Sequence, residues 1–228
     1  MNYDTIEVHL SSEVACVSMN RPEVMNALNT QMRAEITDAY KRLAPQARVI
    51  VLTGRGKAFC SGQDLGDRAN AAQLDLERTL RDEYEPMLRA IIECRIPTIT
   101  ALNGAAAGAG ANLALASDVV IASKSSYFMQ AFTKIGLIPD AGGTYLMPRT
   151  MGLAKAMGAA LFAEKISAEQ ADELGLIWES VADDAFEATW RARAEYLAKG
   201  PTLAYSHLKT ALRASSENNL EAQLADRK

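Results

Sequence analysis

Small residues and one carboxylate stand at three places where chemistry next to a carbonyl group is feasible. The first is the run 103–113, Asn-Gly-Ala-Ala-Ala-Gly-Ala-Gly-Ala-Asn-Leu, which leads into an Ala/Leu-rich helical pattern. Small side chains let a ligand approach the backbone closely. Free N–H groups at the start of a helix can bind an anion or a developing oxyanion. The run therefore predicts a site where backbone amides contact a ligand oxygen.

A second small-residue loop and an isolated acid complete the set. Residues 54–65, Gly-Arg-Gly-Lys-Ala-Phe-Cys-Ser-Gly-Gln-Asp-Leu, follow the buried strand pattern 49–52, as the first run follows the strand pattern 98–102. Loops that leave neighbouring parallel strands can each aim one N–H at a single oxygen. In segment 135–144, Asp140 lies between a proline and a glycine pair. Two amide donors and one carboxylate suffice for enolate chemistry.

The elements around these loops alternate between strand and helix. Segments 6–10 and 14–19 predict a hairpin, and Asn29 and Thr30 can cap a helix over 31–43. Further strands are expected at 119–122 and 127–129. Later helices are expected at 144–150, 153–162, 168–174, 184–198 and 202–214, with Ser167 and Gln170 at capping-box spacing. This alternation predicts an α/β fold with a mainly parallel sheet.

A charged helical segment lies between the two small-residue loops. Residues 71–94 read as helical; they are highly charged up to Glu85 and apolar from Met87 onward. We expect the charged half to be a solvated, mobile flap beside the ligand. Because flap residues shape the pocket, the acyl group of a substrate cannot be named from the sequence.

Composition excludes several classes of function. The chain has 228 residues, 49% hydrophobic and 23% charged, which predicts a folded core. The net charge is −4 and no Lys/Arg run exceeds two residues, which argues against nucleic-acid binding. The glycine order in 104–110 differs from the dinucleotide fingerprint, and no Gly-Lys-Ser/Thr follows it.

Location and metal binding are also constrained. The first residues lack a basic and then apolar leader pattern, and no apolar run reaches membrane-spanning length, which predicts a cytoplasmic protein without membrane contact. Cys16, Cys60 and Cys94 are odd in number and lack CxxC spacing, so reduced thiols are expected. Because His9 and His207 are isolated in the sequence, no metal site is expected.

Taken together, these segments resemble the crotonase family, the enoyl-CoA hydratases and isomerases. The resemblance runs from Asn20-Arg21-Pro22, with Asn26-Ala27-Leu28, to about Lys209. Within that family, Gly62-Gln63-Asp64-Leu65, Leu137-Ile138-Pro139-Asp140 and Trp178 are most similar to the ring-1,2-epoxyphenylacetyl-CoA isomerases of phenylacetate breakdown.

The resemblance implies an architecture and an assembly. Residues 1–198 are expected to form the crotonase spiral of ββα turns. Residues 199–228 are expected to form a C-terminal helical region that makes trimer contacts and stops short of the usual family end. A homotrimer or a dimer of trimers is implied. Coenzyme A would enter as part of the substrate, and no other cofactor is implied.

The resemblance also assigns roles to residues. The backbone N–H groups of Gln63 and Ala109 would form the oxyanion hole, so their side chains are expected to matter little. Asp140 would be the general base, in an apolar pocket lined by Met129, Phe132 and Ile138 that raises its pKa. The alternative for Asp140 is a helix N-cap. Substrate or coenzyme A contacts are expected from Arg21, Ser61, Gly62, Asp64, Leu65, Gly108 and Phe132.

The implied reaction is isomerisation of an acyl-CoA, either a ring epoxide to an oxepin or a 3-enoyl to a 2-enoyl thioester. Hydratases of the family use two glutamates, which would stand at Asn112 and Phe132 here. Neither residue transfers a proton at neutral pH, and no glutamate lies between Glu93 and Glu164. Two alternatives stay open: an enoyl-CoA hydratase, and a catalytically silent acyl-CoA-binding scaffold.

Overall fold

The computed structural model describes residues 2–64 and 75–225. Its larger sheet has the order β1-β2-β3-β5-β7-β10. The hairpin strands β1 (Ile6–Ser11) and β2 (Val14–Met19) are antiparallel, as expected. From β2 onward every neighbouring pair is parallel, through β3 (Val49–Gly54), β5 (Thr98–Leu102), β7 (Val119–Ser123) and β10 (Glu179–Val181).

A second sheet of short strands follows the first. Its order is β4-β6-β8-β9, formed by β4 (Ala58–Cys60), β6 (Ala105–Ala107), β8 (Tyr127–Met129) and β9 (Lys165–Ser167). Each of β3, β5 and β7 is followed in the chain by one of the parallel strands β4, β6 and β8. This repeated passage from large sheet to small sheet to helix confirms the predicted α/β spiral. The sequence pattern missed the three-residue strands β4, β6, β9 and β10, which carry little periodicity, although it did predict β8, a strand of the same length.

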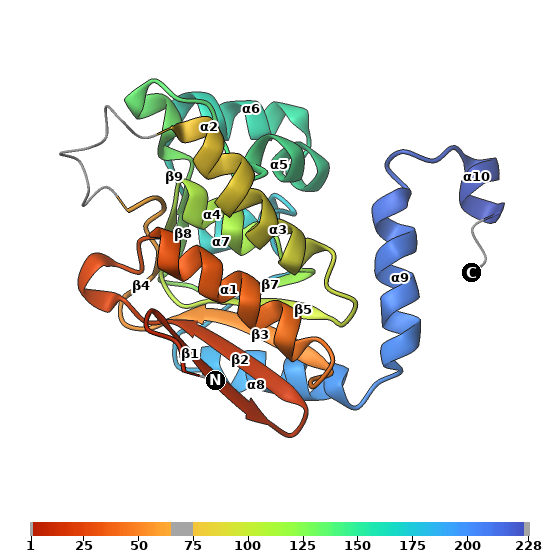
Figure 1. Ribbon diagram of the computed structural model, residues 1–228. Helices are drawn as coiled ribbons and strands as arrows, with labels where there is room; N and C mark the ends of the chain where they lie inside the picture. Colours follow the sequence, from red (N-terminus) through yellow and green to blue (C-terminus); the bar gives the residue numbers. More distant parts are fainter. Residues whose placement is uncertain (1, 65–74, 226–228) are drawn as a thin grey trace.

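Helices cover both faces of the larger sheet (Figure 1). Helix α1 (Thr30–Leu43) starts at Asn29, whose Oδ1 accepts the Met32 N–H, as the cap prediction required. It packs with α3 (Glu85–Ile92) over one face, where the main core lies. Helix α8 (Phe186–Ala198) covers the other face with Trp190.

The remaining helices follow the predicted pattern closely. The structure contains α4 (Ala109–Leu115), α5 (Gly143–Met151), α6 (Leu153–Phe162) and α7 (Ala168–Glu173). Short 3₁₀ turns are η1 (Pro22–Val24) and η4 (Ala131–Ile135). The capping box of Ser167 and Gln170 is formed in both directions.

The charged segment is only partly described, since residues 71–74 of that prediction lie outside the described ranges. From Leu76 it forms α2 (Leu76–Thr79), a π-helical turn η3 (Leu80–Tyr84) and then α3. Most charged side chains of the described part are exposed, as expected of a solvated half, whereas Thr79 and Tyr84 are buried. The π turn places Glu83 beside Arg33 of α1 and Tyr84 beside Gln63 in the loop after β4, and each of these two pairs is hydrogen-bonded.

Helices α9 (Thr202–Ala214) and α10 (Leu220–Ala225) stand away from the two sheets (Figure 1). Their attachment is polar: Lys209 and Arg213 each approach an oxygen of Asp118 at 2.6 Å. Asp118 also accepts hydrogen bonds from the N–H and hydroxyl of Thr98, so this acid joins α9 to the start of β5. Among the described residues, no helix has the length and apolar character needed to cross a membrane.

Candidate active site

The two small-residue loops meet because the strands before them pair. Strands β4 and β6 are parallel, so the chain leaves both at the same edge. A Cβ on Gly62 would lie 2.8 Å from the carbonyl oxygen of Ala107 and 3.4 Å from the nitrogen of Ala109. Gly62 also has a φ of +97°, which other residues rarely adopt. Glycine at this position therefore brings the loop after β4 against the start of α4.

The expected oxyanion donors both have free N–H groups. Gln63 forms a parallel bridge with Leu28, in which the Gly62 carbonyl and the Asp64 N–H bond to Leu28. In that pattern the N–H of Gln63 points away from Leu28. Ala109 is the first residue of α4, whose N–H has no partner within the helix. Within the described residues neither N–H makes a hydrogen bond, so both can donate to a ligand.

The carboxylate of Asp140 has a buried oxygen and a raised pKa. Its Oδ1 is buried and has no hydrogen-bond partner among the described residues. Burial raises the pKa of Asp140 from its ordinary 3.8 to about 6. The N-cap alternative is wrong, because Gly142 occupies the cap of α5 and no side chain bonds there. The carboxylate is therefore spared for another partner.

The pocket expected around Asp140 is only partly formed as predicted. Phe132 is buried, and a Cβ on Gly108 would lie 3.9 Å from the end of its ring, so the ring adjoins the oxyanion loop. Met129 is half-buried at the end of β8. Ile138, however, is 77% exposed, so its place in the lining was predicted wrongly. Its loop follows η4 on the surface and does not turn inward until Pro139.

A buried amide pair holds the Asp140 segment. Asn112 on α4 is fully buried, and its Nδ2 donates to the backbone oxygen of Asp140 at 2.8 Å. Its Oδ1 accepts a hydrogen bond from Gln130 Nε2 at 2.9 Å. A Cβ on Gly143 would collide with the Asn112 amide, so the segment after Asp140 also packs on it. Sequence reasoning treated Asn112 as a missing acid and did not foresee this anchor.

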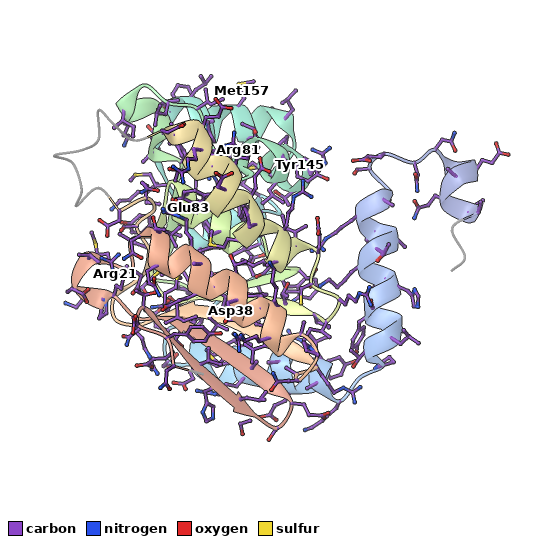
Figure 2. The ribbon with its side chains drawn as sticks, in the orientation of Figure 1. Arg21, Asp38, Arg81, Glu83, Tyr145 and Met157 are labelled. Carbon is purple, nitrogen blue, oxygen red and sulfur yellow. The ribbon has the colours of Figure 1, made fainter. Side chains whose placement is uncertain are left out.

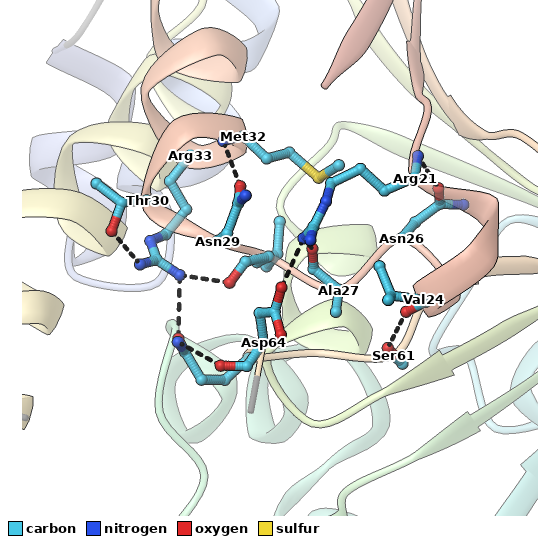
Figure 3. Close-up of polar contacts among 12 residues, drawn as sticks. Arg21, Val24, Asn26, Ala27, Asn29, Thr30, Met32, Arg33, Ser61 and Asp64 are labelled. Carbon is cyan, nitrogen blue, oxygen red and sulfur yellow. Dashed lines mark hydrogen bonds and ion pairs between the residues drawn. The ribbon is translucent and has the colours of Figure 1, made fainter. Parts of the chain in front are cut away.

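The other expected contact residues gather beside the loop after β4 (Figure 3). Arg21 Nη1 lies 2.7 Å from Asp64 Oδ2 and donates to the Ala27 carbonyl at the same distance. Ser61 donates its hydroxyl to Val24 O and its N–H to Met25 O. Leu65 lies outside the described residues. Arg21, Ser61 and Asp64 thus fix the loop itself, and their contact with a ligand stays a prediction.

Asn26 explains why the motif before α1 accompanies this loop. It is fully buried; its Oδ1 accepts the Arg21 N–H and its Nδ2 donates to the carbonyls of Arg55 and Ala58. One side chain therefore ties the segment at Arg21 to both ends of the turn before β4. The side-chain amides of Asn26 and Asn112 therefore hold the segments that form the site.

Comparison with known proteins now identifies the family. The model of the enoyl-CoA hydratase/isomerase family matches residues 9–228. The chain belongs to the enoyl-CoA hydratase/isomerase family. The predicted resemblance and the crotonase-type fold are therefore confirmed.

Relatives of this chain are named for two different reactions, hydration and isomerisation. The chain is 60% identical over 99% of its length to a Rhodobacter capsulatus protein named "Probable enoyl-CoA hydratase", covering 87% of that protein. It is 42% identical over 95% of its length to the Escherichia coli 1,2-epoxyphenylacetyl-CoA isomerase, covering 84% of it. An enoyl-CoA hydratase from Mycobacterium avium subsp. paratuberculosis has a similar structure, with a TM-score of 0.87 and 33% identity over 99% of this chain and 91% of that one.

Within the enoyl-CoA hydratase/isomerase fold, sequence reasoning overlooked one polar group of the site. Arg33 on α1 is 2% exposed at its side chain and contacts the Gln63 side chain. The available signal was an arginine beside Met32, on the helix face that the apolar spacing predicts as buried. Periodicity marks such a residue as buried but does not name its partners.

Proposed function

We propose that this protein isomerises an acyl-CoA thioester through an enolate, with Asp140 as the base. The observation that carries the proposal is the buried Oδ1 of Asp140, which has no hydrogen-bond partner among the described residues and belongs to a carboxyl group whose pKa burial raises to about 6. A carboxylate in that range takes and returns protons near neutral pH. The Asp140 segment is held against α4 by Asn112, and α4 begins at Ala109, one of the two residues proposed as amide donors.

The steps follow from these groups. The thioester oxygen accepts hydrogen bonds from the N–H groups of Gln63 and Ala109. Asp140 removes a proton from the acyl chain, the electron pair moves toward the thioester, and the oxygen gains negative charge. The two amides stabilise that charge more than they stabilise the neutral carbonyl. Asp140 then returns the proton to a different carbon, so the product is an isomer and the base is regenerated.

The substrate class extends to ring epoxides in this proposal. The same stabilisation of an enolate would promote opening of an epoxide on the six-membered ring of the acyl group, and the product would be the oxepin thioester. The identity to the Escherichia coli isomerase supports this version. Arg21, Ser61, Gly62, Asp64, Gly108 and Phe132 are proposed to border the thioester, with coenzyme A supplied by the substrate and no other cofactor required.

Hydration is the second candidate, because the Rhodobacter capsulatus relative is named as a hydratase. Two features favour isomerisation. The amide of Asn112 is committed to Asp140 and Gln130, and the ring of Phe132 adjoins Gly108. Neither side chain can activate a water, and the buried ring excludes one from that side.

We expect isomerisation to exceed hydration in a paired assay. Purified protein would be given crotonyl-CoA and, separately, a 3-enoyl-CoA or a ring-epoxide acyl-CoA. Product should form from the isomerisation substrates, whereas hydration should stay well below about 10 s⁻¹, a typical enzyme turnover. Hydration at that rate or faster would overturn the proposal. Tight acyl-CoA binding without any turnover would favour a silent scaffold.

We also propose a homotrimer or a dimer of trimers. Apolar side chains stand exposed on α9, where Leu203, Leu208 and Leu212 are 73%, 53% and 63% exposed. A second exposed apolar set lies on α5 and α6, where Figure 2 labels Tyr145 and Met157. Such faces need a partner surface. Multi-angle light scattering should give at least three times the mass of the chain, and a stable monomer at working concentration would contradict this.

A further inference from the structure

Arg33 places a buried cation directly behind the oxyanion loop (Figure 3). Its Nη1 donates to the carbonyl of Leu28 at 2.7 Å and to Gln63 Oε1 at 3.0 Å. Its Nε and Nη2 donate to Glu83 Oε2 at 3.0 and 2.6 Å. Buried ion pairs are often no more stabilising than apolar residues of similar size. Stability alone therefore does not account for an arginine at this position.

The Gln63 side chain is fixed at both of its polar atoms. Its Oε1 accepts hydrogen bonds from Arg33 Nη1 and from the hydroxyl of Tyr84, the latter at 2.7 Å. Its Nε2 donates to the carbonyl of Asp64 at 3.2 Å. Tyr84 is only 2% exposed, so its hydroxyl has few alternatives to Gln63. The side chain is held as firmly as the backbone bridge that precedes it.

Arg33 also holds the other strand of that bridge. The carbonyl of Leu28, which accepts the Asp64 N–H, accepts the Arg33 Nη1 donor as well. One guanidinium nitrogen therefore contacts Leu28 and Gln63 together, on the side of Gln63 away from its free N–H. The direction of that N–H depends on both residues of the bridge.

We propose that Arg33 and Tyr84 are positioning residues for the reaction, acting through the Gln63 side chain to aim the Gln63 N–H at the thioester oxygen. This inference rests on the proposed enolate function. It gives the Gln63 side chain a role that was not expected of a residue whose backbone is the donor. It also gives the π-helical turn η3 a role, because η3 positions Glu83 beside Arg33 and Tyr84 beside Gln63.

The physical reason is preorganisation. An amide donor stabilises a developing oxyanion fully only when it already points at the position that the oxygen will occupy. A displacement of about 1 Å in such a group costs up to about 100-fold in rate. The Gln63 N–H belongs to the same planar peptide as the Gly62 carbonyl, which accepts the Leu28 N–H, so the donor is free to turn only as far as that peptide plane tilts. The hydrogen bonds from Arg33 and Tyr84 to the Gln63 side chain restrict that motion.

The link to η3 adds a second consequence. Glu83 bonds to Arg33, and Tyr84 bonds to Gln63, so two adjacent residues of one π turn are joined to the oxyanion loop. Asp140 is among the charges that raise the pKa of Tyr84, after burial as the main cause, so the base and the tyrosine lie in the same electrostatic environment. The network is therefore electrostatically coupled to the proposed base as well as hydrogen-bonded to the proposed donor residue.

The test uses two variants of the network and one control. Gln63→Met removes the acceptor while keeping the backbone N–H, and Tyr84→Phe removes a single hydroxyl. Tyr40→Phe is the matched control, because Tyr40 is also a buried tyrosine and its hydroxyl makes no hydrogen bond to Gln63. Each protein is measured for kcat and KM on the isomerisation substrate and for its thermal unfolding midpoint.

A spectroscopic readout separates positioning from a merely structural role. A dimethylaminocinnamoyl-CoA thioester absorbs at longer wavelength when hydrogen bonds polarise its carbonyl, so its shift on binding reports the oxyanion donors directly. We expect Tyr84→Phe to lower kcat about fivefold, the equivalent of one neutral hydrogen bond. Gln63→Met should lower kcat about tenfold with KM changed little, as for loss of transition-state stabilisation. Both should reduce the shift, and Tyr40→Phe should leave it intact.

The outcomes are distinguishable from failure of the proposed function. If the parent protein binds the thioester without any shift, the oxyanion assignment fails and this inference fails with it. If the parent shifts the absorbance and folded Tyr84→Phe and Gln63→Met shift it equally, the positioning roles alone are overturned. A fall in unfolding midpoint with unchanged kcat and shift in Tyr84→Phe would likewise assign the network to stability only.

Discussion

Asp140→Asn should lower kcat by about 100-fold or more while leaving the fold and coenzyme A affinity in place. That magnitude is the low end for a positioned acid–base group. The asparagine is isosteric, and the backbone oxygen that Asn112 holds is unchanged, so the segment should keep its position. Steady-state kinetics on the isomerisation substrate measure the loss, and equilibrium binding of coenzyme A is the control. Full activity in this variant would refute the assignment of Asp140 as the base.

The pH dependence provides an independent check on the same residue. The base must be ionised to act, so kcat/KM of the parent should fall as the pH drops below about 6, the raised pKa of Asp140. The residual activity of Asp140→Asn should lack that acidic limb. A parent profile that is flat from pH 5 to 8 would place the proton transfer on another group.

The raised pKa also predicts a sign for stability. Between the ordinary Asp pKa of 3.8 and about 6, the folded protein binds more protons at Asp140 than the unfolded chain does. Stability contributed by this group therefore falls as the pH rises through that window. Asp140→Asn removes the cost of burying a charge, so its unfolding midpoint at pH 7 should be at or above that of the parent. A clear decrease would indicate that the carboxylate has a structural partner.

Ala109→Pro is expected to have the second large effect. It removes the proposed donor and should raise the activation barrier by about 3 kcal/mol, the scale for one lost oxyanion donor. Position 109 suits this test, because it is the first residue of α4, where proline is tolerated in a helix. The glycine before it also relieves the usual restriction on a residue that precedes proline.

The comparison for this variant is Ala109→Ser, which keeps the N–H while enlarging a side chain that is 3% exposed. The proline variant should lose far more activity than the serine variant, at similar unfolding midpoints. Equal losses would show that crowding at position 109, and not the N–H, limits the reaction. A structure with bound acyl-CoA in which the thioester oxygen lies far from both amides would also overturn the donor assignment.

The sequence predicted the long elements and the two loops, because these carry strong local signals. The hairpin, α1 with its Asn29 cap and the capping box of α7 all follow from short-range patterns. The free N–H of Gln63 was reached only through the resemblance, since it depends on a bridge to Leu28 far along the chain. Local patterns specify helices and strands. Contacts between distant segments determine which backbone N–H groups remain without a hydrogen bond and can therefore bind a ligand.

The polar interior of the site was the least predictable part. Arg33 and Glu83 are 50 positions apart, and Asn112 and Asp140 are 28 apart. Nothing in the periodicity of either pair signals the other partner. Ile138 shows the opposite error. Its apolar side chain and its place next to Asp140 in the sequence predicted a position in the pocket, but the loop turns this side chain outward.

The Asn112 amide sets the route by which a protein like this one can change its reaction over evolution. A hydratase-type glutamate at position 112 would have no N–H to offer the Asp140 backbone, and it would face Gly143, which packs on the amide. That substitution would therefore loosen the segment that carries the proposed base, Asp140, while Phe132 still occupied the space that a water would need. Asn112→Glu alone is therefore expected to weaken the proposed isomerisation without creating hydration.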